Sequence, residues 1–142
     1  MRSRPRDPVP WRACLVIVVA VLAAGCSRSG PDRFRVSGTV THAGQPVALG
    51  RIVFEPDASR GNSGPQGFAP IENGRYDTAT PNCKGSVGGP MIVMIDGLKL
   101  GGGDDVAASG MLLFPTHQER VDMPRSGTTL DFDVPNAAGP VR

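Results

Sequence analysis

The chain has 142 residues, enough for one domain after a short leader, and its 19 glycines and 14 prolines favour turns and short strands over long helices. The formal net charge of +2 is unevenly distributed. Residues 1–25 carry four arginines against one aspartate, whereas residues 26–142 carry 11 basic and 12 acidic side chains. The folded part therefore lacks the clustered basic surface that nucleic acids require, and we expect no nucleic-acid partner.

Residues 1–25 have the organisation of an export signal. An arginine-rich start, MRSRPRDPVPWR, precedes an apolar stretch at 13–25, whose core of about 12 residues lies within the range of secretory signals. A helix of that length spans about 18 Å, well short of a hydrocarbon core of about 30 Å. We therefore expect a cleaved signal peptide instead of a retained membrane span.

The apolar stretch ends in Leu22-Ala23-Ala24-Gly25-Cys26, which resembles the lipobox of bacterial lipoproteins. The resemblance implies cleavage before Cys26 and attachment of fatty acyl chains, such as palmitate, to this residue. At least two acyl chains give durable anchoring. We expect the protein in the cell envelope, on the outer face of the cytoplasmic membrane or on the outer membrane. An ordinary signal peptide followed by a chance cysteine is the alternative.

After Cys26 the sequence first has the composition of a tether and then the pattern of a strand-rich domain. Residues 26–32 are small, polar and turn-prone, which is typical of a flexible tether. Between 33 and 135, short apolar or alternating segments are separated by turn signals, and no amphipathic helix is indicated. We predict strands over 34–41, 49–55, 66–71, 75–80, 91–95, 119–123 and 128–134, with a further apolar run at 111–114.

These segments predict a small antiparallel β-sandwich of about seven strands, an all-β fold, followed by a disordered tail at 136–142. Asn73-Gly74 indicates a tight hairpin because both turn positions need a positive φ. The run at 91–95 is apolar at every position, which predicts a central strand covered on both faces. Alternation predicts inward side chains at Ile52, Phe54, Tyr76, Thr78, Val121, Met123, Leu130, Phe132 and Val134, with Asp131 and Asp133 facing solvent.

Several of these segments resemble carboxypeptidase regulatory-like domains. Val36–Val40, Gly44–Val47 and Arg51–Phe54 are similar to the opening of that domain, Glu72–Tyr76 to its second landmark, and Leu130–Val134 to the closing strand of small lipoproteins built on it. The resemblance implies a prealbumin-like sandwich of seven strands. These motifs carry fold and no chemistry. The chain departs from the family at Gly89–Val93, which lacks the usual aromatic residue.

No catalytic or metal constellation stands out. His42 and His117 are far apart and lack the H-x-x-E or H-E-x-x-H spacing of zinc sites, so we interpret them as a solvated turn residue and a loop residue. Ser63 and Ser126 lack the G-x-S-x-G setting of a serine nucleophile and read as turn formers.

Three further residues have side chains that could react or bind a metal: Cys83, Asp104 and Asp105. Cys83 is either a buried small hydrophobe or a free thiol. Asp104 and Asp105 lack the interleaved oxygen ligands that calcium prefers. We expect no enzyme activity, no cofactor and no bound metal, and Cys26 is the residue whose chemistry we expect to matter.

Three classes of function remain. The favoured class is a noncatalytic, membrane-tethered interaction or structural module, possessing loops at 57–67 and 97–110 for a protein partner in the envelope. The second is a carbohydrate- or small-ligand-binding module, which the sequence supports less because Trp11 lies in the leader and Tyr76 is predicted inward. An enzyme is the least supported class.

Overall fold

A computed structural model describes residues 30–101 and 111–136 of the chain. The predicted signal peptide, Cys26, Asp104 and Asp105 lie outside the described residues, as do most of the tail and part of the tether. In the described ranges, no helix has the length and apolar character needed to cross a membrane.

The described part of the chain is built from strands, with one short 3-10 helix. The elements are β1 (Val36–His42), β2 (Gln45–Pro46), β3 (Leu49–Pro56), η1 (Ala58–Arg60), β4 (Gly67–Glu72), β5 (Arg75–Asp77), β6 (Gly89–Leu98), β7 (His117–Met123), β8 (Thr128–Thr129) and β9 (Phe132–Val134). The prediction of an all-β fold is confirmed, and most of the predicted strands match observed ones to within two residues.

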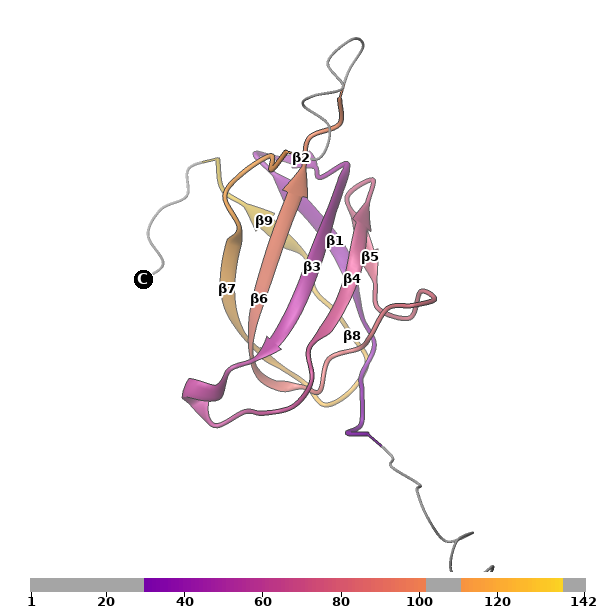
Figure 1. Ribbon diagram of the computed structural model, residues 1–142, viewed down its shortest axis with the longest axis vertical. Helices are drawn as coiled ribbons and strands as arrows, with labels where there is room; N and C mark the ends of the chain where they lie inside the picture. Colours follow the sequence, from indigo (N-terminus) through magenta and orange to yellow (C-terminus); the bar gives the residue numbers. More distant parts are fainter. Residues whose placement is uncertain (1–29, 102–110, 137–142) are drawn as a thin grey trace, which may run out of the picture. The chain divides into compact units, whose positions relative to one another are not determined.

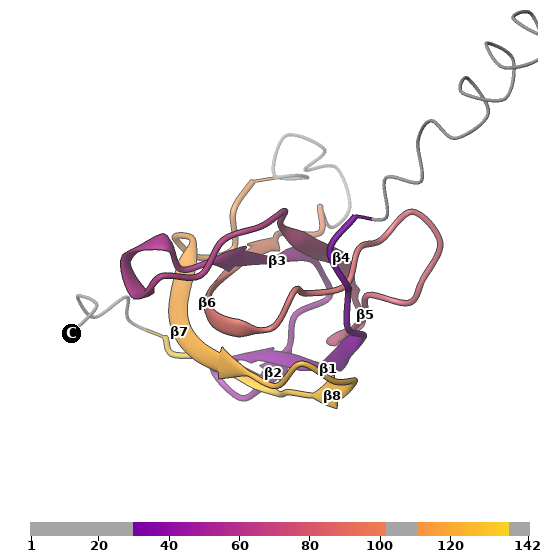
Figure 2. The ribbon, with the colours of Figure 1, turned by 90° about the horizontal axis from the view of Figure 1, so that it is seen from below.

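The strands form one sheet in the order β2-β1-β5-β4-β3-β6-β7, and this sheet curls so that its two halves face each other. Figure 2 shows β3, β4 and β6 along one wall, with β1, β2 and β8 along the opposite wall. Neighbours along this path pair antiparallel, with β3 lying between β4 and β6. The two halves of the predicted sandwich are thus walls of one continuous curled sheet.

The last two strands differ from the expected antiparallel arrangement. The segment predicted as one strand over 128–134 is broken at Leu130-Asp131 into β8 and β9, and both run parallel to β1. Ser37 pairs with Asp77 of β5 on one edge and with Thr129 of β8 on the other. Because sequence alternation is the same for either direction, it could not reveal this parallel pairing.

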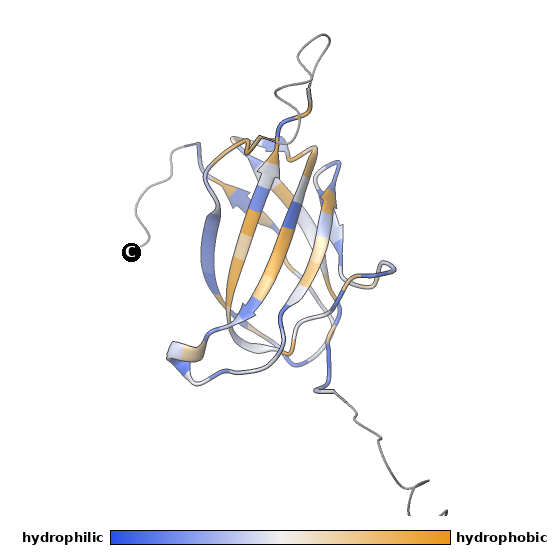
Figure 3. Ribbon diagram, in the orientation of Figure 1, coloured by the Kyte–Doolittle hydropathy of each residue, from blue (hydrophilic) through white to orange (hydrophobic). Residues whose placement is uncertain are grey.

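The core lies between the two walls. Its buried apolar residues come from both halves of the sheet: Val36, Val40, Val47, Ile52, Phe54, Ala69, Ile71, Tyr76, Val87, Met91, Val93, Ile95, Phe114, Met123, Phe132 and Val134. In Figure 3 the strands β3 and β6 are largely hydrophobic, whereas β7 is hydrophilic along most of its length. Burial therefore follows the period-two pattern of the predicted inward residues, with Val121 and Leu130 only partly buried.

The β4–β5 hairpin has the predicted turn. Asn73 and Gly74 both have positive φ, at 50° and 73°, as a two-residue type I′ turn requires. A side chain at Gly74 would also meet Pro46, since its Cβ would lie 2.6 Å from the Pro46 Cβ. The glycine is therefore needed for its backbone angle and for close packing.

The prediction that β6 is covered on both faces is wrong. Met91, Val93 and Ile95 are buried, but Ile92 and Met94 face outward and are only half-buried. Antiparallel sheets commonly bury one face only. The curled sheet encloses its inner face and leaves the outer face partly in contact with solvent.

The apolar run at 111–114 pairs antiparallel with the end of β6. The Lys99 N–H donates to the Met111 carbonyl oxygen at 2.8 Å, and the Leu113 N–H donates to the Gly97 carbonyl oxygen at 2.7 Å. A bridge joins Leu98 to Leu112. We call residues 98–100 and 111–113 the apolar arm; Figure 1 shows this part of the chain at the end of the sheet where β6 finishes.

Candidate functional site

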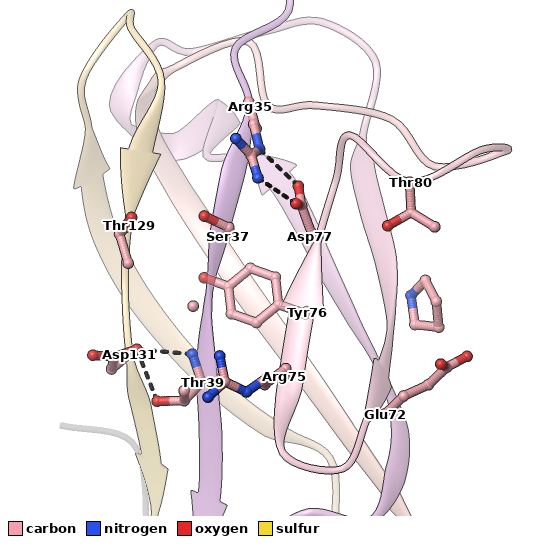
Figure 4. Close-up of a pocket in the computed structure, with 12 residues that line it drawn as sticks. Arg35, Ser37, Thr39, Glu72, Arg75, Tyr76, Asp77, Thr80, Thr129 and Asp131 are labelled. Atoms are coloured by element: carbon pink, nitrogen blue, oxygen red, sulfur yellow. Dashed lines mark hydrogen bonds and ion pairs between the residues drawn. The ribbon is translucent and has the colours of Figure 1, made fainter.

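A polar groove of about 500 Å³ lies on the outside of the curled sheet, over β1, β4, β5 and the β8–β9 segment (Figure 4). Five side chains that are charged at neutral pH line it: Arg35, Glu72, Arg75, Asp77 and Asp131. Four serine and threonine hydroxyl groups also line it, from Ser37, Thr39, Thr80 and Thr129. Polar residues at alternating positions of β1 reach the groove because successive side chains of a strand point to opposite faces.

One side of the groove is held by a two-point ion pair. The Arg35 Nε donates to Asp77 Oδ1 at 2.9 Å, and a terminal guanidinium nitrogen of Arg35 donates to Asp77 Oδ2 at 2.5 Å. The Ala79 N–H also donates to Asp77, at 2.9 Å. The hydrogen bond from Arg35 and the backbone donor stabilise the ionised carboxylate, which lowers the pKa of Asp77 to about 2.

The opposite side is held by Asp131, at the break between β8 and β9. Its Oδ1 accepts hydrogen bonds from the Thr39 N–H and the Thr39 hydroxyl, both at 2.8 Å. Two residues on, Asp133 accepts from the Thr41 hydroxyl at 2.7 Å. The two aspartates face outward as predicted, and each also accepts a hydrogen bond from a threonine of β1. The donors on Thr39 lower the pKa of Asp131.

Arg75 is the unpaired cation of the groove. It lies opposite Thr39 in the β1–β5 register, so the two side chains share the outer face. Among the described residues, no carboxylate lies within ion-pair distance of Arg75 and no hydrogen bond forms to its guanidinium. In Figure 4 this guanidinium extends across β1 at the level of Thr39. The groove therefore presents a charged donor group for which the described residues supply no partner.

The floor of the groove is closed by Tyr76 and Gly38. Tyr76 is buried, as predicted, and its hydroxyl donates to the Leu130 carbonyl oxygen at 2.7 Å. Burial raises the pKa of Tyr76 above its ordinary value. A Cβ at Gly38 would lie 1.8 Å from the same carbonyl oxygen. The Tyr76 ring thus belongs to the core and offers no free face for stacking on a sugar.

The two histidines differ from the sequence interpretation. His42 is the last residue of β1 and is half-buried; its Nδ1 lies 3.1 Å from the Val134 carbonyl oxygen and its ring centroid 4.7 Å from that of Phe114. It is therefore not a solvated turn residue, because β1 extends to His42, one residue beyond the predicted end of the strand at 41. His117 begins β7 instead of lying in a loop, and its Nε2 is 3.9 Å from a carboxylate oxygen of Glu119.

The remaining candidates stay separate. Ser63 and Ser126 are exposed in the turns where they were expected. Cys83 is half-buried against the core, with its thiol 3.8 Å from the Pro81 carbonyl oxygen, so it combines features of both interpretations. In the ranges that the structure describes, no three His, Cys, Asp or Glu side chains gather in a way that could hold a metal ion.

Sequence reasoning missed the buried carboxylate of Asp57. Its Oδ1 accepts from the Ser59 N–H at 3.0 Å and from the Ser59 hydroxyl at 2.5 Å, and its Oδ2 lies 3.4 Å from Arg120 Nε on β7. The donors on Ser59 and the nearby arginine lower the pKa of Asp57 against the opposing effect of burial. Asp57 therefore fixes the start of the 57–67 loop, and its place in a Gly- and Ser-rich stretch gave no sign of burial.

Comparison with protein-family models, curated proteins and solved structures finds no match to this chain.

Proposed function

We propose that the protein is a bacterial lipoprotein, anchored in the cell envelope through lipid on Cys26, which carries a noncatalytic β domain as an interaction or structural module. The observation that carries the proposal is the sequence Leu22–Cys26 at the end of a signal-like apolar stretch. The carboxypeptidase regulatory-like resemblance supports a domain of this type, and the all-β fold is compatible with it.

The arrangement just after the proposed lipid site supports anchoring. Pairing of the domain begins at Phe34, whose N–H and carbonyl groups exchange hydrogen bonds with Ser86 at 2.7 and 3.0 Å. One residue earlier, a guanidinium nitrogen of Arg33 donates to the Gln66 and Gly85 carbonyl oxygens. Only a few residues therefore separate Cys26 from the fixed part of the domain, which would be held close to its membrane.

A noncatalytic role agrees with the chemistry of the groove. Asp77 binds Arg35 and Asp131 accepts hydrogen bonds from Thr39, and the pKa of each carboxylate is lowered. A general acid or base works best with a pKa near the operating pH, so these carboxylates are poorly suited to proton transfer. The groove is instead suited to hydrogen bonding with a polar partner.

A second candidate function, binding of a small ligand, is favoured by Arg75. An unpaired guanidinium beside hydroxyl groups is suited to a carboxylate, which it can bind through two parallel hydrogen bonds. Sugar binding has less support because Tyr76 is buried. We expect a peptide with a free carboxylate, alanyl-alanine, to produce saturable NMR shifts at Thr39 and Arg75. The Arg75→Gln variant should lose the shifts, and equal shifts with the amidated peptide would rule out this mode.

The anchor is tested by metabolic labelling with a radioactive fatty acid in a bacterial host. We expect label in the wild-type protein and in Cys83→Ser, and none in Cys26→Ser, because Cys26 alone stands directly after the proposed cleavage site. The Cys83→Ser variant controls for the effect of losing a thiol. Equal labelling of wild type and Cys26→Ser, or an unlabelled wild type, would contradict the proposal.

A further inference from the structure

Exposed apolar side chains gather at one end of the domain. Of the six large hydrophobic side chains exposed in the described residues, four lie on the apolar arm and Leu49 lies near its base. Leu100 is 64% exposed, Met111 57% and Leu112 48%. Scattered exposed hydrophobic residues are ordinary, but a contiguous apolar patch marks an interaction surface.

The patch combines projecting side chains with a hollow. An apolar depression of about 290 Å³ adjoins the arm and is lined by Pro46, Ala48, Leu98, Leu100 and Leu113, together with Lys99. Met111 and Leu112 are exposed beside it. A surface that carries both the projecting group and the receiving hollow is self-complementary, which is what a twofold interface requires.

The arm lies at the far end of the domain from the tether. Pro31 lines a hollow with Asn62 and Arg125, and the Asn62 side chain donates to the carbonyl oxygens of Gly88 and Pro90 at the start of β6. The arm extends from the other end of β6, ten residues along. At about 3.4 Å per residue, these two ends of the strand are about 30 Å apart.

The length of the tether argues against the anchoring membrane as the occupant of the patch. Four residues lie between Cys26 and Pro31, and the five steps from one to the other reach at most about 18 Å at about 3.6 Å each. The arm therefore cannot point into the bilayer, because Pro31 would then stand about 30 Å from the lipid. In the remaining orientations the patch is available to a protein surface beside or above the domain.

We propose that this occupant is a second copy of the same chain, with Met111 and Leu112 of each copy seated in the other's apolar hollow. The inference rests on the proposed lipid anchor. Copies that are tethered to one membrane by identical segments carry their arms at the same height above it. A twofold axis along the membrane normal would bring the two arms together and keep both tethers on the membrane side. Confinement of both copies to one membrane raises their effective concentration, which favours association of the two patches.

The test is cross-linking of the full-length protein in membranes. A Leu112→Cys substitution is made in a Cys83→Ser background and treated with a short bis-maleimide, and the matched control is Ser63→Cys at the tether end. We expect about tenfold more cross-linked dimer from Leu112→Cys than from Ser63→Cys, and loss of that dimer when Leu100→Asp is added. Both substituted positions are exposed, so neither change disturbs the core.

The other outcomes separate this inference from the anchor. Equal yields at the two positions, no dimer at either, or a cross-linked band containing a different protein would overturn the second-copy assignment. Dimer formation in the Cys83→Ser parent would mean that the Cys26 thiol is free of lipid. Recovery of that parent protein in the soluble fraction would mean the same. Either result would contradict the proposed function on which the inference rests.

Discussion

Gly38 occupies the point where β1 passes closest to the chain between β8 and β9. We predict that Gly38→Ala lowers the free energy of unfolding by about 3 kcal/mol, because the new Cβ would meet the Leu130 carbonyl oxygen at 1.8 Å and force the backbone apart. Gly127→Ala is the control, since its Cβ would lie 3.9 Å from the nearest atom and should change stability by no more than about 0.5 kcal/mol. Urea denaturation measures both, and similar losses would contradict this account of the crossing.

Tyr76 can be followed directly because it is the one tyrosine in the sequence. Its raised pKa means that the native state holds the phenolic proton more tightly than the unfolded state. This contribution to stability is complete below the ordinary pKa of 10.0 and is lost as the pH rises above it. We predict that phenolate absorbance appears only together with alkaline unfolding, and ionisation near pH 10 in the folded protein would contradict the burial. Loss of the hydroxyl in Tyr76→Phe should cost about 1 kcal/mol.

Asp77 has a pKa depressed from its ordinary 3.8 to about 2, so its contribution to stability is present above pH 4 and is lost as the pH falls toward 2. We predict that Asp77→Asn loses less stability over this pH range than wild type. Arg35→Gln should raise the pKa of Asp77, which carboxyl-carbon NMR measures. An unchanged Asp77 pKa in Arg35→Gln would contradict the role of the ion pair. The energetic effect is modest because both side chains are partly exposed.

At the scale of elements, the 57–67 loop depends on a single carboxylate. We predict that Asp57→Ala lowers stability by about 1–3 kcal/mol, because it removes the acceptor for Ser59 and leaves Arg120 without its buried partner. Faster amide exchange at Ser59 and Asn62 should accompany the loss. Ser59→Ala keeps the backbone N–H donor and should cost less. A larger loss in Ser59→Ala than in Asp57→Ala would contradict this assignment.

The alternation of residues located the strands, but it did not show which strands pair with each other. The pattern around Ile52 and Phe54 and the Asn73-Gly74 turn depend on local residues, so the sequence contained enough information to locate β3 and the β4–β5 hairpin. The polar groove depends on the register of β1 against β5 and β8, which local residues do not determine. The sequence alone therefore could not assign Arg75 to a site, because only the folded sheet shows that Arg75 lies opposite Thr39.

Partial burial was similarly hard to predict. The unbroken apolar run at 91–95 suggested cover on both faces, yet Ile92 and Met94 are only half-buried. Asp57 is the opposite case: its loop-like sequence suggested exposure, but its charged side chain is fully buried. Both depend on how the sheet curls, which is a property of the whole domain.

At the scale of the whole molecule, the described domain has two distinct ends. The chain enters near Arg33 at one end, and the apolar arm extends from the other. The polar groove lies along the wall between them. In the account proposed above, this arrangement holds one end near the membrane, leaves the groove open to polar partners and presents the arm to a neighbouring copy.

The central claim is that the mature chain begins at a lipid-modified Cys26. The most direct measurement is mass spectrometry of the N-terminal peptide from protein produced at full length in a bacterial host and purified from the membrane fraction. We predict a peptide that starts at Cys26 and carries the added mass of two or three acyl chains. A peptide that starts at another residue, or an unmodified cysteine in the mature protein, would contradict the claim.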